Sequence, residues 1–115
     1  MPSAMPKPSD EARARFDEAV DRLAAERDVA RAPMFGMPAV KVAGGRAFAG
    51  LFGDGLTAKL GRGARERALG LEGAGPFDPM GGRPMREWVL IPLAHAGEWD
   101  AYMRAAEEYV RGAAV

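Results

Sequence analysis

Apolar and small residues alternate on both sides of a glycine-rich turn in residues 46–60. Two alternating sets precede the turn: Phe48, Gly50 and Phe52 in one, and Ala47, Ala49 and Leu51 in the other. Two more sets follow it: Leu56, Ala58 and Leu60 against Thr57 and Lys59. A period of two is typical of strands with a buried face. Asp54 and Gly55 tolerate the positive φ of a tight turn, so the pattern predicts a central β-hairpin.

Further strand patterns lie before and after this hairpin. Residues 32–35 and 37–43 read as strands, although Pro38 removes a backbone donor and favours an edge or a strand start. The short connections between these segments predict antiparallel pairing. Residues 86–92 are apolar in both alternating sets, so we expect an internal strand with a buried Trp88.

Helical patterns flank the strands. Residues 10–27 place Phe16, Val20 and Leu23 on one stripe after Ser9, a favourable N-cap, and residues 96–111 form a final amphipathic helix. A short helix lies within residues 61–70 and ends at Gly70, whereas residues 71–85 have no period and predict an irregular loop. We therefore expect an α+β, two-layer sandwich with an antiparallel sheet of four to five strands and the order α-β-β-β-(β)-α-β-α.

Length and composition limit the functional classes. The 115 residues fit one domain, residues 9–115, after a disordered tail with three prolines in residues 1–8. The balance of 16 basic and 16 acidic residues argues against strong non-specific binding of nucleic acid. There is no cysteine for disulfides or thiolate metal sites, and a single His95 cannot form a histidine-rich metal site. No signal peptide or membrane-length apolar run is evident, so we expect a cytoplasmic protein.

The least generic segment is the Gly- and Pro-rich stretch of residues 75–85. In one interpretation it is a backbone cradle that presents Arg83 to an anion or a partner. In the other it is a packed connection, in which Phe77 and Met85 fill the core and Arg83 pairs with a carboxylate. Gly81 and Gly82 do not open a helix after a strand, so this is not a phosphate-binding P-loop.

Basic and methionine side chains give two further candidate surfaces. Lys59 lies opposite the apolar set of its strand, and with Lys41 and Arg86 it would form a basic stripe across the sheet; the alternative is three ordinary exposed residues. Four methionines bracket the sheet, either as adaptable core or as a binding surface: Met34, Met37, Met80 and Met85.

Residues for catalysis are lacking in the sequence. His95 has no paired acid nearby in the chain, so we do not expect it to be catalytic, and Ser3 and Ser9 lie in the tail and at a helix cap. A Ser-His-Asp hydrolase needs its serine in an ordered site. We therefore predict no catalytic, cofactor-binding or metal-binding residues, and we expect that the protein is not an enzyme.

Several short motifs occur together in a characteristic order: Met34-Phe35-Gly36, the strands of residues 48–52 and 56–60, Pro76-Phe77, and Gly82-Arg83-Pro84-Met85 before an aromatic strand. In this order and spacing, residues 16–110 resemble the N-terminal domain family of TfoX/Sxy. The resemblance implies a two-layer α/β domain with an antiparallel sheet. The named family members regulate natural competence with the catabolite-activator protein and carry a second, helical domain. We expect this chain of 115 residues to be a stand-alone, single-domain member of the family. A less close similarity is to YjbR-like domains, which have been grouped with DNA-binding folds.

These observations lead to one main expectation and two alternatives. The main one is a non-enzymatic, TfoX-like interaction module that binds another protein, is linked to transcription regulation, and forms a homodimer through a free sheet edge or face. The first alternative is a nucleic-acid-binding domain that uses Lys41, Lys59, Arg83 and Arg86. The second is a small-ligand-binding domain around the Gly-Gly-Arg-Pro loop.

Overall fold

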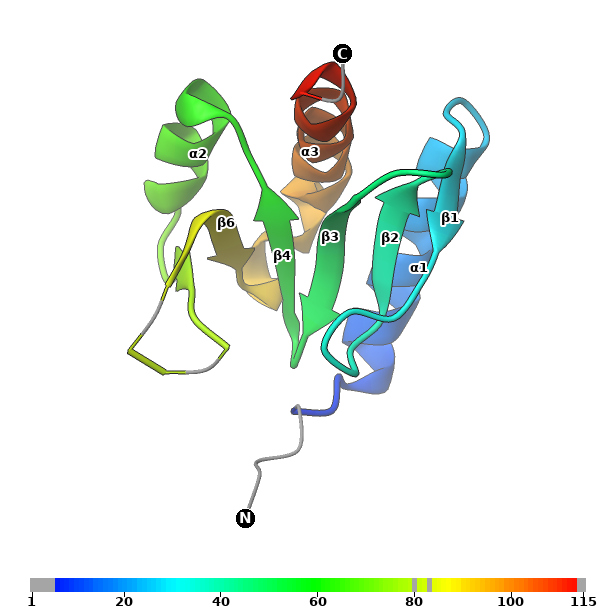
Figure 1. Ribbon diagram of the computed structural model, residues 1–115. Helices are drawn as coiled ribbons and strands as arrows, with labels where there is room; N and C mark the ends of the chain where they lie inside the picture. Colours follow the sequence, from blue (N-terminus) through cyan, green and yellow to red (C-terminus); the bar gives the residue numbers. More distant parts are fainter. Residues whose placement is uncertain (1–5, 80, 83, 114–115) are drawn as a thin grey trace.

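The computed structural model describes residues 6–79, 81–82 and 84–113, which form an α+β domain (Figure 1). The helices are α1 (Asp10–Ala24), α2 (Arg62–Leu69), the 3₁₀ helix η1 (Leu93–Glu98) and α3 (Trp99–Ala113). The strands are β1 (Val29–Arg31), β2 (Ala39–Val42), β3 (Ala47–Phe52), β4 (Gly55–Lys59), β5 (Gly75–Phe77) and β6 (Met85–Ile91). The predicted tail of residues 1–8 lies largely outside the described residues, as do Met80 and Arg83. No helix in the described ranges is long and apolar enough to cross a membrane.

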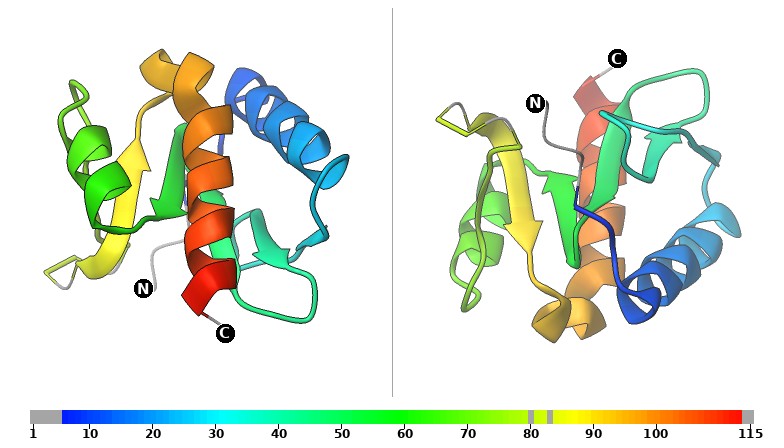
Figure 2. Two further views of the ribbon diagram at one scale, coloured as in Figure 1. Left: turned by 90° about the horizontal axis from the view of Figure 1, so that it is seen from above. Right: turned by 90° about the horizontal axis from the view of Figure 1, so that it is seen from below.

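The six strands form one antiparallel sheet in the order β1-β2-β3-β4-β6-β5. All three α-helices pack on one side of it, with α3 across the centre and α1 and α2 on either side (Figure 2). This confirms the predicted α+β class and the antiparallel sheet. The predicted number of strands was too low, because β5 forms within the stretch expected to be an irregular loop. Its Gly75 and Pro76 give no strand signal, and the strand is recruited by pairing with β6.

The first predicted strand, residues 32–35, is replaced by the end of a longer hairpin. β1 ends at Arg31, and the β1–β2 pairing continues through Ala32 and Ala39 to a bridge between Met34 and Met37. In this register Pro33 faces Pro38 across the hairpin. The Ala32 N–H donates to the Ala39 carbonyl on one side of this pair, and Met34 and Met37 exchange two hydrogen bonds on the other, so the two prolines occupy positions where the hairpin ladder needs no N–H. Phe35 and Gly36 therefore form the hairpin tip.

A β-bulge at Phe48 changes which residues share a face of the sheet. Val40 pairs with Ala49 but Lys41 pairs with Ala47, so Phe48 is an extra residue in β3. As a result Phe48 joins the core under the helices, together with Ala49. The strict alternation expected for residues 47–52, with Phe48 and Phe52 on one face, is therefore wrong. An inserted residue shifts the side-chain direction of one part of the strand relative to the other.

The turn between β3 and β4 anchors the start of α1. Its residue with positive φ is Gly53, at +55°, rather than Asp54 or Gly55, and Gly55 already pairs with Phe52 inside the sheet. The Asp54 carboxylate accepts a hydrogen bond from the Ser9 backbone N–H at 2.7 Å. The Ser9 hydroxyl in turn accepts from the Ala12 N–H, which confirms Ser9 as the N-cap.

The predicted helix boundaries were partly wrong. α1 ends at Ala24, three residues before the expected Arg27, because the chain must turn back toward the sheet edge at β1. The final helix begins at Trp99 after the 3₁₀ segment η1, which Pro92 caps, instead of at residue 96. α2 lies within the predicted range, and Gly70 is its C-cap.

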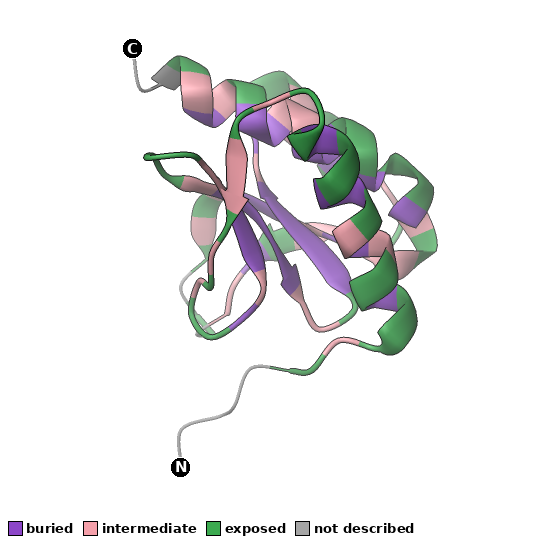
Figure 3. Cartoon of the chain, turned by 90° about the vertical axis from the view of Figure 1, so that its right-hand side faces the viewer, coloured by how far each residue is buried: buried purple, intermediate pink, exposed green. Residues whose placement is uncertain are grey.

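Two hydrophobic clusters lie on the two faces of the sheet. In Figure 3 the buried positions lie along the central strands and on the sides of the helices that face them. The larger one packs under the helices. The second, which we call the methionine–aromatic cluster, is centred on three buried side chains and four partly buried ones: Met37, Phe77 and Trp88, with Met34, Ala47, Phe52 and Met85. The rings of Phe52 and Phe77 meet edge to face with centroids 5.1 Å apart. The predictions of a buried Trp88, of methionines as core, and of Phe77 and Met85 as core-filling residues are confirmed for the described residues.

We expect Trp88→Ala to lower the free energy of unfolding by about 3–5 kcal/mol, because it would leave a large cavity in the methionine–aromatic cluster. Trp88 is only 8% exposed, whereas Leu69 on α2 is 42% exposed. Leu69→Ala is therefore the control, with an expected loss of less than about 1 kcal/mol. Urea unfolding followed by circular dichroism measures both. Equal losses in the two variants would contradict the central role of this cluster.

Candidate functional site

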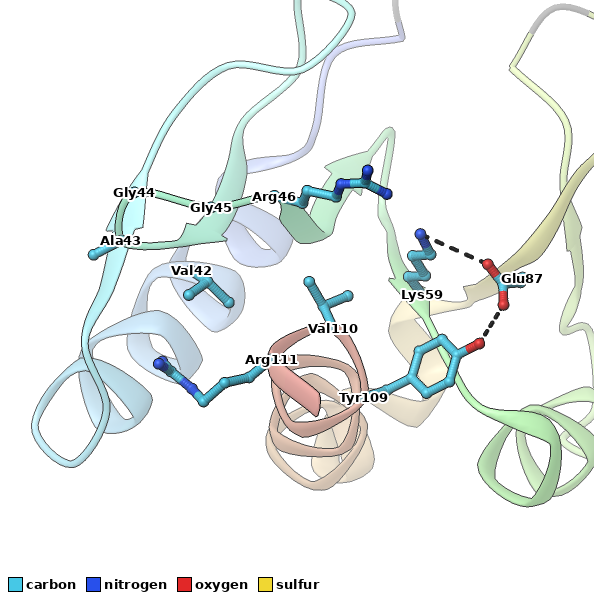
Figure 4. A pocket seen from close by; sticks show the side chains of 10 residues that line it. All are labelled: Val42, Ala43, Gly44, Gly45, Arg46, Lys59, Glu87, Tyr109, Val110 and Arg111. Carbon is cyan, nitrogen blue, oxygen red and sulfur yellow. Dashed lines mark hydrogen bonds and ion pairs between the residues drawn. The ribbon is translucent and has the colours of Figure 1, made fainter. Parts of the chain in front are cut away.

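A groove of about 960 Å³ opens where the sheet meets the end of α3 (Figure 4). It is lined by the β2–β3 turn, the ends of β4 and β6, and the last turns of α3. We refer to it as the α3 groove, and its lining residues are Val42, Ala43, Gly44, Gly45, Arg46, Lys59, Glu87, Tyr109, Val110 and Arg111.

One backbone carbonyl holds two walls of the α3 groove together. The Asp28 carbonyl, between α1 and β1, accepts a hydrogen bond from the Ala43 N–H at 3.0 Å and another from Arg111 Nη2 at 3.2 Å. The β2–β3 turn itself closes through a bond from the Val42 N–H to the Arg46 carbonyl, with Gly44 at a φ of +73°. The turn and the helix end are thereby fixed relative to each other.

The buried carboxylate of Glu107 holds Arg111 in place. Glu107 is fully buried, and its two oxygens pair with Arg27 Nε at 3.1 Å and with Arg111 Nε. A carboxylate is tolerated in the interior only when cations and hydrogen bonds compensate the loss of hydration. The guanidinium of Arg111 is therefore a fixed part of the wall, and it shares the single negative charge of Glu107 with Arg27.

A second acidic residue, Glu87, lines the opposite wall. The Tyr109 hydroxyl donates a hydrogen bond to Glu87 Oε2, and Lys59 Nζ lies 3.6 Å from Oε1. The bond from Tyr109 lowers the pKa of Glu87 and the charge of Lys59 lowers it further, while partial burial opposes the shift. The same bond raises the pKa of Tyr109. At neutral pH the pair is a carboxylate and a protonated phenol, which suits binding better than proton transfer.

Arg46 is the cation of the groove without a compensating acid. It is exposed, and its side chain has no hydrogen bond or ion pair with any of the described residues. In Figure 4 it extends toward the Lys59 ammonium. The lining thus carries three cations and one carboxylate, and the imbalance is concentrated between Arg46 and Lys59.

The structure brings together only some of the predicted site residues. Lys59 lines the α3 groove and pairs with Glu87, and Arg86 shares a neighbouring hollow with Arg65 and Glu87. Lys41 lies on β2 opposite Ala30 and Ala47 and lines neither of these hollows. Arg83 lies outside the described residues.

His95, which we did not expect to be catalytic, lies outside the lining of the α3 groove. A ring nitrogen of His95, Nε2, lies 2.8 Å from the Glu72 carbonyl, a contact that fastens η1 to the loop before β5. Among the described residues there is no group of three or more potential metal ligands.

Sequence reasoning missed the contributions of Arg46, Tyr109 and Arg111 to the groove. Arg46 had one local signal, its position directly after the Gly44-Gly45 turn. Tyr109 and Arg111 are two residues apart on a helix and had no signal of their own. Their meeting with Glu87 and Asp28 depends on how α3 crosses the sheet.

A different feature, outside the groove, is the hairpin tip at Phe35. Phe35 has a φ of +53° and is the one non-glycine residue with positive φ in the described part of the chain. Gly36 follows at +79°, and Met34 and Met37 exchange two backbone hydrogen bonds across the turn. Such turns with two positive φ values favour Asn-Gly. Here the strained position carries a phenylalanine that is 55% exposed.

We expect Tyr109→Phe to raise the pKa of Glu87 toward its ordinary value near 4.5, because it removes the largest cause of the shift. Since the folded pKa of Glu87 is lowered, its stabilising contribution is present above that ordinary value and is lost as pH falls through the folded pKa. The acid-side loss of stability should therefore be weaker in the variant. Carboxyl NMR titration and urea unfolding across pH measure this. Tyr102→Phe is the control, and an unchanged Glu87 titration in Tyr109→Phe would contradict the assignment.

Comparisons with known proteins leave the geometry as the basis for a functional proposal. No protein-family model matches the chain, and neither a curated protein nor a solved structure is significantly similar to it.

Proposed function

We propose that this chain is a non-catalytic, TfoX-like interaction module, linked to transcription regulation, that binds a partner protein through the hairpin tip at Phe35. The observation that carries the proposal is a large aromatic side chain that is exposed in a left-handed backbone conformation. Strained residues of this kind persist where the surroundings fix them, and they concentrate at functional positions.

The fold requires a turn at residues 35 and 36 but does not require a phenylalanine there. The methionine–aromatic cluster is anchored by Met37 and Met34 on either side of the tip. Asn or Gly at position 35 would satisfy the same turn without the steric cost. Because more than half of the Phe35 surface is exposed, internal packing explains only part of the choice. A partner with an apolar pocket would bury the rest, as aromatic anchor residues do at protein interfaces.

The sheet edges support binding by the tip rather than by strand addition. β1 and β5 are the two edge strands, and each has only three residues. Pro33 follows β1 and Pro76 lies within β5. Short edges and prolines limit the donors available to an incoming strand. If the partner is a second copy of the chain, we therefore expect the tip and not an edge to form the contact.

The link to transcription regulation is supported by the resemblance to TfoX-like domains. Met34-Phe35-Gly36, the first motif of that resemblance, is the strained turn itself. The lowered pKa of Glu87 makes its carboxylate a weak base at neutral pH, which supports a non-catalytic role for the α3 groove.

We expect Phe35→Asn to be more stable than Phe35→Ala by about 1 kcal/mol, because Asn tolerates the left-handed region better than Ala. Both variants lose the aromatic ring, so their difference isolates the backbone strain from the lost contacts. Thermal unfolding followed by circular dichroism measures it. Equal stability would show that position 35 is not strained in solution.

We expect partner binding to depend on the Phe35 ring. The tagged chain and its Phe35→Asn variant serve as baits in native lysate, with quantitative mass spectrometry of captured proteins. Leu69→Asn removes another exposed apolar side chain and is the matched control. Components of transcription regulation that are captured by the chain and by Leu69→Asn, but lost with Phe35→Asn, would support the proposal. Identical capture by all three baits would contradict it.

The same variants test self-association. Sedimentation equilibrium should show a mass that falls to the monomer in Phe35→Asn if the partner is a second copy. A dimer that persists in this variant would place the contact elsewhere and contradict binding through the tip.

A further inference from the structure

We propose that the α3 groove binds a small organic anion, whose carboxylate or phosphate group lies between Arg46 and Lys59 and whose apolar part lies along Val42, Tyr109 and Val110. This inference does not depend on the Phe35 tip, which lies at the other end of the β1–β2 hairpin from the groove-lining Val42.

Two cations, Arg46 and Lys59, converge in the α3 groove. Arg46 has no acidic partner among the described residues, and its side chain extends toward Lys59 in Figure 4. Lys59 has a single ion pair, with Glu87 at 3.6 Å, which is longer than a good charge-assisted hydrogen bond. Two like charges directed into one space repel each other unless an anion lies between them. A carboxylate or phosphate supplies that charge and accepts several N–H donors at once.

Glu87, the acid of the groove, does not compensate both of these cations. Glu87 Oε2 accepts from Tyr109, which holds the carboxylate against the α3 wall. Its other oxygen lies 3.6 Å from Lys59 Nζ. Among the residues that the structure describes, Arg46 is left without an acid, so the charge of Glu87 compensates one of the two converging cations and not both.

Contacts within the chain fix the walls of the α3 groove before any ligand binds. Arg111 is fixed by Glu107 and by the Asp28 carbonyl, and the β2–β3 turn is fixed by the same carbonyl through Ala43. A rigid wall lowers the entropic cost of binding a ligand. The groove is therefore suited to a ligand that enters without a rearrangement of the sheet or of α3.

The volume of the α3 groove and its apolar lining indicate the size and the apolar part of the ligand. A volume of about 960 Å³ is large for an inorganic anion and is within the range of small-molecule sites. Val42 and Val110 are side chains of the lining, and both pack against the helix-side core. With the Tyr109 ring they offer an apolar surface beside the cations. This arrangement fits a carboxylate or phosphate ester on an aromatic or aliphatic body.

The test is an amide NMR titration of the full chain with four probes. Benzoate and phenyl phosphate carry the two anionic groups, inorganic phosphate lacks the apolar body, and benzyl alcohol lacks the charge. We expect saturable shifts of residues 42–46, 59, 87 and 109–111 with benzoate or phenyl phosphate, and the stronger of the two identifies the anionic group. Inorganic phosphate and benzyl alcohol should bind more weakly.

Two matched variants complete the experiment. Arg46→Gln should weaken binding of the stronger probe by about tenfold or more, because it removes charge-assisted hydrogen bonds. Arg13→Gln changes another exposed arginine, on α1 and outside the α3 groove, and should leave affinity unchanged. The spectra themselves report whether each variant remains folded. Shifts that do not saturate, that do not depend on Arg46, or that benzyl alcohol reproduces would overturn the proposal.

Discussion

The structure depends on one constraint, namely that both faces of the central strands exclude water. Every residue of β4 from Gly55 to Ala58 is buried, so the sheet needs a cover on each side. The helices cover one face only. On the other face, Met37 lies directly over Gly50, and a Cβ added at position 50 would be 2.6 Å from the Met37 methyl carbon. The row of Phe52, Phe77 and Trp88 covers the rest of that face. Large side chains of the strands, with Met34 and Met37 from the end of the β1–β2 hairpin, thus do on one face what the helices do on the other.

This requirement connects the hairpin tip to the core. Met34 and Met37 must both reach the second face, and a two-residue turn between paired residues is the shortest way to keep them there. Turns of this length match the twist of the strands when both central residues have positive φ. Gly36 adopts such a conformation freely, but Phe35 does so at a steric cost. Core packing therefore explains the backbone at position 35 but not the identity of the exposed side chain, for which we propose contact with another molecule.

The sequence predicted those features whose cause is local. Alternation in residues 46–60 identified β3 and β4, Ser9 identified the start of α1, and the doubly apolar pattern identified the internal strand with Trp88. The bulge at Phe48 had no local signal, because one added residue leaves the composition of a strand unchanged. β5 was missed because Gly75 and Pro76 become a strand only through β6. Of the groove, sequence reasoning found Lys59, whereas Tyr109 and Arg111 acquire their partners through the crossing of α3 over the sheet.

The zero net charge of the chain conceals local differences in how charged side chains are paired. Most surface arginines that bridge elements have acids beside them, as Arg22 has Asp100 and Arg104 has Glu26. A net charge of zero follows from 16 cations and 16 anions, and it excludes strong long-range attraction of polyanions. At physiological ionic strength, however, exposed charges act over only about 8 Å, so binding responds to the charges within one groove rather than to their sum. Arg46, which has no acidic partner in the described part of the chain and extends toward Lys59, is then a local excess of positive charge in a neutral molecule. Such an arrangement favours a small anion held by direct contact over a nucleic acid attracted from a distance.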